Sequence, residues 1–146
     1  MSESIDVMTL KAPVEAIFDV LADGTAYAHW VVGAKAVRRV DQAWPAKGTC
    51  FYPTVGIGPF TIKDSTECLE VEAPRRIVLE ARMRPLMVAT VELQLEPVDE
   101  GTQVTMTERP SAGLVTPLGR LMVPALSLRN KLSLARLERL VQARVS

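Results

Sequence analysis

The most constraining feature of this sequence is a run of strand-like segments followed by one long helical segment. Between Lys35 and Arg109, stretches rich in Val, Ile, Thr and Phe are separated by turns that contain Gly, Pro, Asp or Glu. This pattern is typical of consecutive antiparallel strands. We predict strands at residues 35–41, 48–55, 60–71, 76–84, 86–96 and 102–109.

The segment before this run predicts one strand and two short helices. Residues 4–10 alternate between the two faces of a strand. Apolar residues then recur with helical spacing on one face after Pro13, and a second short helix is predicted at 27–32. The chain therefore opens with a strand and a pair of helices rather than with a crossover to a parallel strand.

The segment after the run is helical. We expect a short lead-in from Pro117, an interruption at Pro124, and a long helix from about Ala125 to Ala143. One helix cannot cover both faces of a sheet of about seven strands. We therefore predict an α+β fold in which a curved antiparallel sheet wraps around the C-terminal helix, with space between their apolar faces.

Composition and motifs exclude several classes of function. The 146 residues predict a single domain spanning 1–146, and 17 basic against 17 acidic residues argue against a nucleic-acid partner. The absence of a long apolar run and of a signal-peptide pattern predicts a cytoplasmic protein. A single histidine excludes a multi-histidine metal site, and no phosphate loop or dinucleotide motif occurs, so neither metal nor cofactor is expected. The sequence does not indicate an oligomeric state.

The zero net charge conceals an uneven distribution. Residues 117–146 hold six basic and one acidic residue, whereas the remaining residues hold 11 basic and 16 acidic ones. A basic C-terminal helix could make peripheral contact with an anionic membrane or a partner. The interpretation that we favour is a solvated helix that pairs with the rim of the sheet.

Several short segments, taken in order, carry a family resemblance. They are residues 12–21 (Ala-Pro-Val-Glu-Ala-Ile-Phe-Asp-Val-Leu), 27–30 (Tyr-Ala-His-Trp), 48–51 (Gly-Thr-Cys-Phe), 70–77 (Glu-Val-Glu-Ala-Pro-Arg-Arg-Ile) and Asn130. Together they resemble the SRPBCC superfamily, the helix-grip proteins that include START lipid-transfer domains, pollen-allergen-like carriers and polyketide cyclase/dehydrases. The resemblance implies a deep cavity for hydrophobic or amphipathic molecules between sheet and helix. It implies no common reaction.

Two carboxyl groups are candidates for catalysis or ligand recognition. The alternation of Val104 and Met106 places Glu108 on the inward face, as a pocket acid or base or a hydrogen-bond acceptor for a ligand. In the alternative interpretation, which we favour, the strand ends before Glu108, or Arg109 or another arginine neutralises it at the rim. If Phe60, Ile62 and Cys68 point inward, their parity carries Asp64 inward too, but Leu69 and Val71 have the opposite parity, so a bulge must intervene. For Asp64 we favour exposure to solvent, as is usual for acidic residues.

Three further polar or amphipathic residues are weaker candidates. His29 precedes Trp30 on the second short helix, and we favour a surface or rim position for the histidine and a packing role in the pocket wall for the tryptophan. Asn130 interrupts the apolar seam of the last helix and must find a partner, either the protein backbone or a ligand.

These observations lead to one main hypothesis and two alternatives. The main hypothesis is that a hydrophobic or amphipathic small molecule, such as a lipid, quinone or polyketide, binds in the central cavity. The alternatives are an enzyme resembling the polyketide cyclase/dehydrases, with Glu108 or Asp64 as the base, and a lipid or quinone carrier that docks on membranes. The predicted ligand-binding residues are Trp30, Phe51, Phe60, Leu79, Leu93, Met106, Glu108, Leu126, Asn130 and Leu134, with His29 a weaker candidate.

Overall fold

The computed structural model describes residues 3–83, 87–112 and 119–145. Its elements are β1 (Ser4–Leu10), α1 (Val14–Leu21), the 3-10 turn η1 (Gly24–Ala26), α2 (Tyr27–Trp30), β2 (Ala34–Val40), β3 (Cys50–Ile57), β4 (Phe60–Lys63), β5 (Ser65–Glu72), β6 (Arg76–Met83), β7 (Met87–Val98), β8 (Gly101–Ala112) and α3 (Gly119–Val145). The predicted order of a strand, two helices, a run of strands and a long helix is confirmed.

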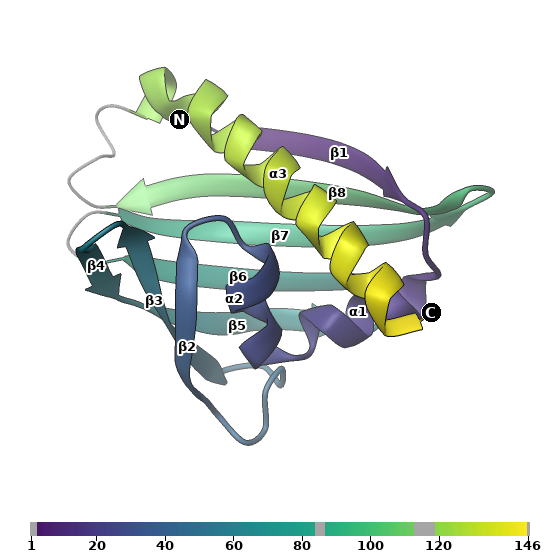
Figure 1. Ribbon diagram of the computed structural model, residues 1–146, viewed down its shortest axis with the longest axis horizontal. Helices are drawn as coiled ribbons and strands as arrows, with labels where there is room; N and C mark the ends of the chain where they lie inside the picture. Colours follow the sequence, from purple (N-terminus) through teal and green to yellow (C-terminus); the bar gives the residue numbers. More distant parts are fainter. Residues whose placement is uncertain (1–2, 84–86, 113–118, 146) are drawn as a thin grey trace.

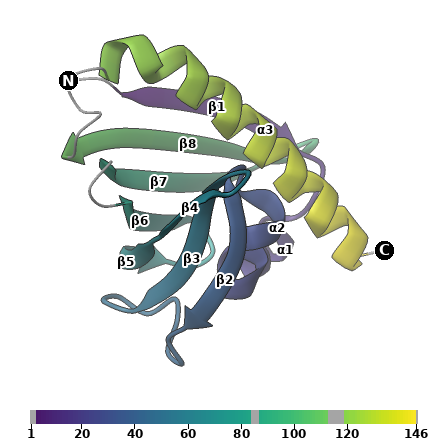
Figure 2. The same ribbon diagram turned by 60° about the vertical axis from the view of Figure 1, so that its left-hand side comes forward.

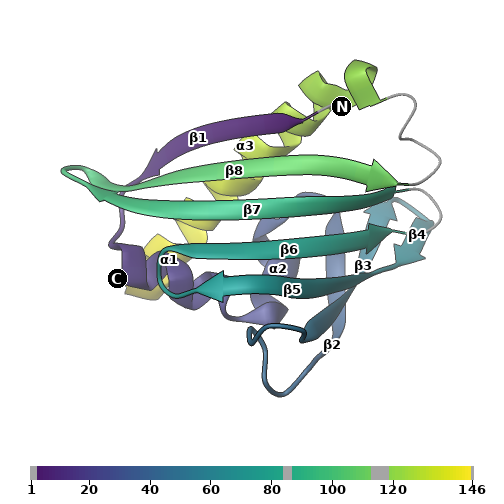
Figure 3. The same cartoon turned by 180° about the vertical axis from the view of Figure 1, so that it is seen from behind.

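The strands form one antiparallel sheet that curves around the last helix. Its order is β1-β8-β7-β6-β5-β3-β2, and β4 pairs with β3 beside this path. The strands β3 and β2 turn out of the plane of β6, β7 and β8, while α3 runs diagonally across the concave side (Figures 1 and 2). Seen from behind, the helices all lie on the far side of the sheet (Figure 3). The predicted α+β class with a sheet curved around the C-terminal helix is therefore confirmed.

The predicted strand 60–71 is two strands in the structure. The chain breaks at Asp64, whose backbone N–H donates to the carbonyl of Pro53 at 2.8 Å. The first part, β4, makes a hairpin with the end of β3, and the second part, β5, pairs with the start of β3 and with β6. The sequence predicted a bulge near Leu69, and it is present: the pairing of β5 with β6 shifts register between Cys68 and Glu70.

The last helix differs from the prediction at its beginning. Instead of breaking at Pro124, α3 runs without interruption from Gly119 to Val145. A proline removes one backbone hydrogen bond from a helix, but Pro124 lies near the N-terminal end, where few such bonds precede it, and it faces solvent. The prediction of an interruption there was wrong.

The core fills the space between α1, the concave face of the sheet and the second half of α3. The apolar spacing predicted for α1 is confirmed, because its five buried residues, from Val14 to Leu21, face this core. From α3 come Leu134, Leu137 and Val141, none of them exposed. Burial also raises the pKa of the Cys68 thiol to about 11, so this cysteine is a neutral core residue at physiological pH.

Aromatic side chains gather at one end of this core. The ring of Tyr27 lies 5.1 Å from that of Trp30 and 4.4 Å from that of Phe51, measured between centroids, and Trp44 meets Phe51 edge-on at 4.9 Å. The hydroxyl of Tyr27 donates to the carbonyl of Leu21 at 3.0 Å, so its polar end is satisfied within the protein. This cluster joins α2 to β3 and forms one wall of the cavity described next.

Candidate functional site

A cavity lies between the concave face of the sheet, α2 and α3. Its volume is about 80 Å³. Apolar and aromatic residues make up most of its wall, and Asp64, Thr66, Glu108 and Arg129 are the polar exceptions. The described lining is Tyr27, Trp30, Val31, Ala34, Phe51, Pro53, Val55, Asp64, Thr66, Leu79, Ala81, Val91, Leu93, Met106, Glu108 and Arg129.

Most of the predicted wall residues lie in this lining. They are Trp30, Phe51, Leu79, Leu93, Met106 and Glu108, contributed by α2, β3, β6, β7 and β8. For those on strands the positions follow from strand parity, since alternate residues of each strand face the concave side, whereas Trp30 is placed by α2. Their contact with a ligand stays a prediction.

The predicted wall residues Phe60 and Leu134 lie elsewhere, as does the weaker candidate His29. Phe60 was wrongly placed in the wall: its side chain is 82% exposed, because the strand break makes it the first residue of the outlying hairpin strand β4. Leu134 is fully buried in the core and does not line the cavity, since it lies further along α3. The side chain of Leu126 lies outside the described part of the structure. His29 is exposed on α2 and does not line the cavity, as the rim interpretation had it.

The carboxyl group of Glu108 is held by two consecutive residues of α3. Glu108 is 2% exposed, and its Oε1 accepts a hydrogen bond from Nδ2 of Asn130 at 3.2 Å. Its Oε2 lies 3.5 Å from a guanidinium nitrogen of Arg129. The inward position predicted for Glu108 is therefore observed, together with the arginine partner that the alternative interpretation required. That arginine comes from α3 rather than from the neighbouring Arg109, which pairs with Glu3.

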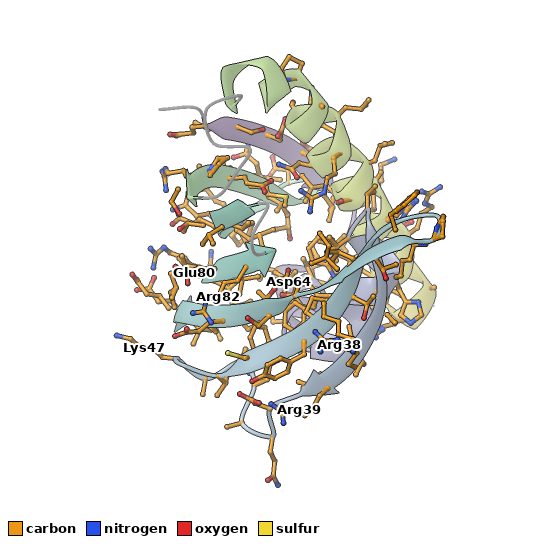
Figure 4. All side chains as sticks on the ribbon, turned by 90° about the vertical axis from the view of Figure 1, so that its left-hand side faces the viewer. Arg38, Arg39, Lys47, Asp64, Glu80 and Arg82 are labelled. Atoms are coloured by element: carbon orange, nitrogen blue, oxygen red, sulfur yellow. The ribbon has the colours of Figure 1, made fainter. Side chains whose placement is uncertain are left out.

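Asp64 faces the cavity, contrary to the solvent exposure that we favoured. Its side chain lines the cavity, and the residue is 5% exposed. Parity explains the burial, because Asp64 and the buried Thr66 and Cys68 share one face of the β5 segment. Figure 4 shows Asp64 inside the curve of the sheet, with Arg38 on one side and Arg82 and Glu80 on the other.

The environment of Asp64 raises its pKa to about 6. Burial is the main cause, and it is opposed by hydrogen bonds from the backbone N–H groups of Ser65 and Arg82. The two nearby arginines are engaged elsewhere. Arg38 donates to the backbone carbonyls of Pro53 and Asp64, and Arg82 pairs with Glu80 and Glu67. Among the described residues, no basic side chain forms an ion pair with the carboxyl group of Asp64.

Two polar atoms beside the cavity lack a protein partner. The indole nitrogen of Trp30 and Oδ1 of Asn130 are buried and make no hydrogen bond within the described structure. Trp30 itself lines the cavity, and Asn130 holds the Glu108 carboxyl group that does. Because buried polar atoms without partners are costly, the indole N–H of the lining residue Trp30 suits a bound molecule that carries a hydrogen-bond acceptor.

The mouth of the cavity lies between the α2–β2 segment, β3, β6 and α3. Its position follows from the lining residues that are only half-buried, which are Val31, Ala34, Val55, Ala81 and Arg129. At this mouth α3 is tied to Val32, whose N–H donates to Oγ of Ser133 at 3.0 Å and whose carbonyl accepts from Nε of Arg129 at 3.1 Å.

Sequence reasoning missed Arg129 as a site residue, although it directly precedes the predicted Asn130. An arginine next to a buried helical amide was the available signal, since both side chains reach the same carboxyl group. Within the described residues there is no group of three or more His, Cys, Asp or Glu side chains placed to hold a metal ion. The site thus consists of an apolar chamber with two carboxyl groups and one arginine.

Comparison with known proteins places this chain in a family. Residues 2–142 match the family described as polyketide cyclase / dehydrase and lipid transport. The chain belongs to this family. Its sequence matches no curated protein. Within the described residues no helix is long and apolar enough to cross a membrane.

Solved structures share the fold of this family member at low sequence identity. Protein NE0264 from Nitrosomonas europaea superimposes with a TM-score of 0.74 at 20% identity, over 98% of this chain and 96% of that one. Ara h 8.0201 gives 0.76 at 12% identity, over 97% of both chains. The di-domain ARO/CYC StfQ from the steffimycin biosynthetic pathway gives 0.77 at 11% identity, over 99% of this chain and 51% of that one. These likenesses confirm the helix-grip fold, and the family match over residues 2–142 confirms the predicted SRPBCC relationship.

Proposed function

We propose that this protein binds a hydrophobic or amphipathic small molecule in the cavity between α3 and the curved sheet. The observation that carries the proposal is an apolar chamber whose few polar groups, Asp64, Glu108 and Arg129, converge on the same space. Such a chamber with a small number of placed polar groups is the usual form of a small-molecule site. Membership of a family described as polyketide cyclase / dehydrase and lipid transport supports it.

The size of the cavity limits how such a molecule is held. A volume of about 80 Å³ is below the roughly 300–1,000 Å³ typical of pockets for drug-sized ligands. A molecule the size of a lipid or polyketide therefore fits only if the wall moves outward. At the half-buried mouth, α3 meets the α2–β2 segment through two hydrogen bonds to one residue, Val32, so an outward movement there would have to break these two bonds.

A matched pair of tryptophan substitutions on β2 tests the proposal. Ala34 lines the cavity and is half-buried, whereas Ala36 is exposed and lies beyond a register shift in the same strand. We expect Ala34→Trp to fill the cavity and abolish binding of the hydrophobic dye anilinonaphthalene sulfonate, and Ala36→Trp to leave it unchanged. Native mass spectrometry of the same proteins should show a co-purified small molecule in the wild type and in Ala36→Trp alone. Equal dye binding and equal cargo in both variants would refute the cavity as the binding site.

The state of Asp64 favours a second function, proton abstraction from an acidic C–H group. With a pKa of about 6 and no ion-pair partner among the described residues, its carboxylate is mostly ionised at pH 7 and free to act as a base. In this step a carboxylate oxygen takes the proton, and the electron pair of the C–H bond moves into an adjacent carbonyl to give an enolate. Glu108 suits this role less, because both its oxygens already have partners.

Deuterium exchange into a cyclic 1,3-diketone tests this second function. We expect the wild type to accelerate exchange above the buffer rate, with a rate that falls as the pH drops below about 6, because the base becomes protonated. Asp64→Asn should lose at least roughly a hundredfold of the acceleration, and Glu108→Gln should retain most of it. An unchanged rate in Asp64→Asn that still binds the diketone would exclude Asp64 as the base.

A further inference from the structure

A strongly basic and partly apolar surface surrounds the mouth of the cavity. Three of the four chain segments that build this mouth, residues 24–40, 51–63 and 127–137, contain seven basic residues and no acidic residue. The basic residues are Lys35, Arg38, Arg39, Lys63, Arg129, Lys131 and Arg136. The fourth segment, β6, carries Glu80, which pairs with Arg82.

Large apolar side chains are exposed on the same segments. Phe60, at the start of β4, is 82% exposed, and Leu128 and Leu132, one turn apart on α3, are 61% and 49% exposed. Exposed basic residues stand beside them: Arg136 on α3, and Lys35 at the start of β2. We call the exposed side chains of Lys35, Phe60, Leu128, Leu132 and Arg136 the mouth surface.

Hydrogen bonds join the three segments around the opening. The β3–β4 hairpin is bonded to the start of β2, since Lys35 Nζ donates to the carbonyl of Gly58 at 2.5 Å and Gly56 N–H to that of Gly33 at 2.9 Å. Val32, which directly precedes Gly33, is hydrogen-bonded to Arg129 and Ser133 of α3. The exposed phenylalanine, leucines and cations therefore belong to elements that meet at the opening of the cavity, as the curl of β2 and β3 toward α3 allows (Figure 2).

We propose that the mouth surface docks on a membrane that contains anionic phospholipids, with the mouth of the cavity facing the bilayer. Exposed Phe and Leu side chains enter the boundary between headgroups and acyl chains, while Lys and Arg beside them attract the anionic headgroups. The absence of acidic residues from all three segments is the charge complement that such a surface requires. This inference rests on the proposed function in one respect: the bilayer is where a hydrophobic molecule would enter or leave the cavity.

Sedimentation with lipid vesicles tests the docking directly. We expect the wild type to bind vesicles of phosphatidylcholine mixed with phosphatidylglycerol, to bind vesicles of phosphatidylcholine alone far less, and to be released as salt is added. Lys35→Gln together with Arg136→Gln should weaken binding at least roughly tenfold, since each cation near an anionic surface adds to the attraction. Phe60→Ser together with Leu128→Ser should weaken it similarly, and because these side chains are exposed, both proteins should stay folded.

Matched controls separate the mouth surface from charge and apolarity in general. Lys47→Gln together with Arg75→Gln removes two exposed cations outside the three segments, and Arg75 lies in the β5–β6 turn, at the opposite end of the sheet from β4 (Figure 3). Val7→Ser removes a 53% exposed apolar side chain on the edge strand β1. Both controls should bind vesicles as the wild type does.

Three results would overturn the docking proposal. These are equal binding to neutral vesicles, loss of binding in the controls to the same degree as in the mouth variants, and a dimer in solution that Phe60→Ser with Leu128→Ser dissociates, which would assign the surface to a second copy of the chain. Failure of docking is distinguishable from failure of the proposed function. If the wild type does not bind vesicles but carries a co-purified molecule that is missing from Ala34→Trp, the proposed cavity function stands and only the membrane-docking proposal is refuted.

Discussion

At the scale of single residues, Asp64 shows what strand parity can and cannot predict. Alternation from Cys68 back through Thr66 correctly points Asp64 inward, but the general preference of carboxylates for solvent argued against it. Two backbone N–H groups and the nearby charges of Arg38 and Arg82 offset part of the cost of burying this carboxylate, although its pKa stays raised. For Glu108 the parity argument sufficed, although its partners come from α3, which is distant in the sequence.

The raised pKa of Asp64 predicts how stability depends on pH. The folded state binds this proton more tightly than the unfolded chain, whose carboxyl has a pKa near 3.8, so ionisation costs stability as the pH rises from about 4 to about 6. Asp64→Asn cannot ionise. Its free energy of unfolding relative to the wild type should therefore increase between pH 4 and pH 7.5, by about 1–2 kcal/mol once screening by solvent is allowed for. Urea denaturation at several pH values measures this difference, and a difference that is constant with pH would contradict the raised pKa.

At the scale of elements, the sequence predicted the kinds of segment well and their breaks poorly. The spacing of apolar residues located β1, α1 and the strands around the turns. The split between β4 and β5 escaped prediction because it is set by pairing: β3 bonds to β4 with one part of its length and to β5 with another. Nothing in the sequence of residues 60–71 indicates which strand each half of this segment will pair with. Phe60 was misplaced for this reason.

The C-terminal helix makes contacts with two of its faces, an inward face and a flank, and only the role of the inward face could be predicted. Its inward face supplies core residues in its second half and the ligands of Glu108 in its first half. On its flank, Ser133 accepts from the N–H of Val32 at the mouth, and Arg129, which also pairs with Glu108, donates to the carbonyl of Val32. The seam of apolar residues in the sequence reveals the first face, but a flank that bonds to backbone atoms leaves no pattern of residue types. The hydrogen bonds at Val32 are accordingly a finding of the structure alone.

At the scale of the whole molecule, the curved sheet and α3 enclose a core and a cavity that share one apolar lining. Leu93 and Leu134 are both fully buried, but only Leu93 faces the cavity. Packing in these two regions therefore has different consequences, although residue type and burial are the same. The distinction depends on how closely the sheet and the helix approach at each level, which the sequence does not specify.

The same substitution at Leu93 and at Leu134 enlarges the cavity in one protein and provides a matched control in the other. Leu93→Ala and Leu134→Ala should each lower the free energy of unfolding by about 2–5 kcal/mol, because each removes buried contacts and leaves a void. Only Leu93→Ala merges that void with the cavity, so it alone should bind anilinonaphthalene sulfonate more tightly than the wild type while remaining cooperatively folded. Chemical denaturation measures the first effect and dye titration the second. If both variants gained affinity for the dye equally, loosened packing rather than an enlarged cavity would be the cause, and the separation of core from cavity would be wrong.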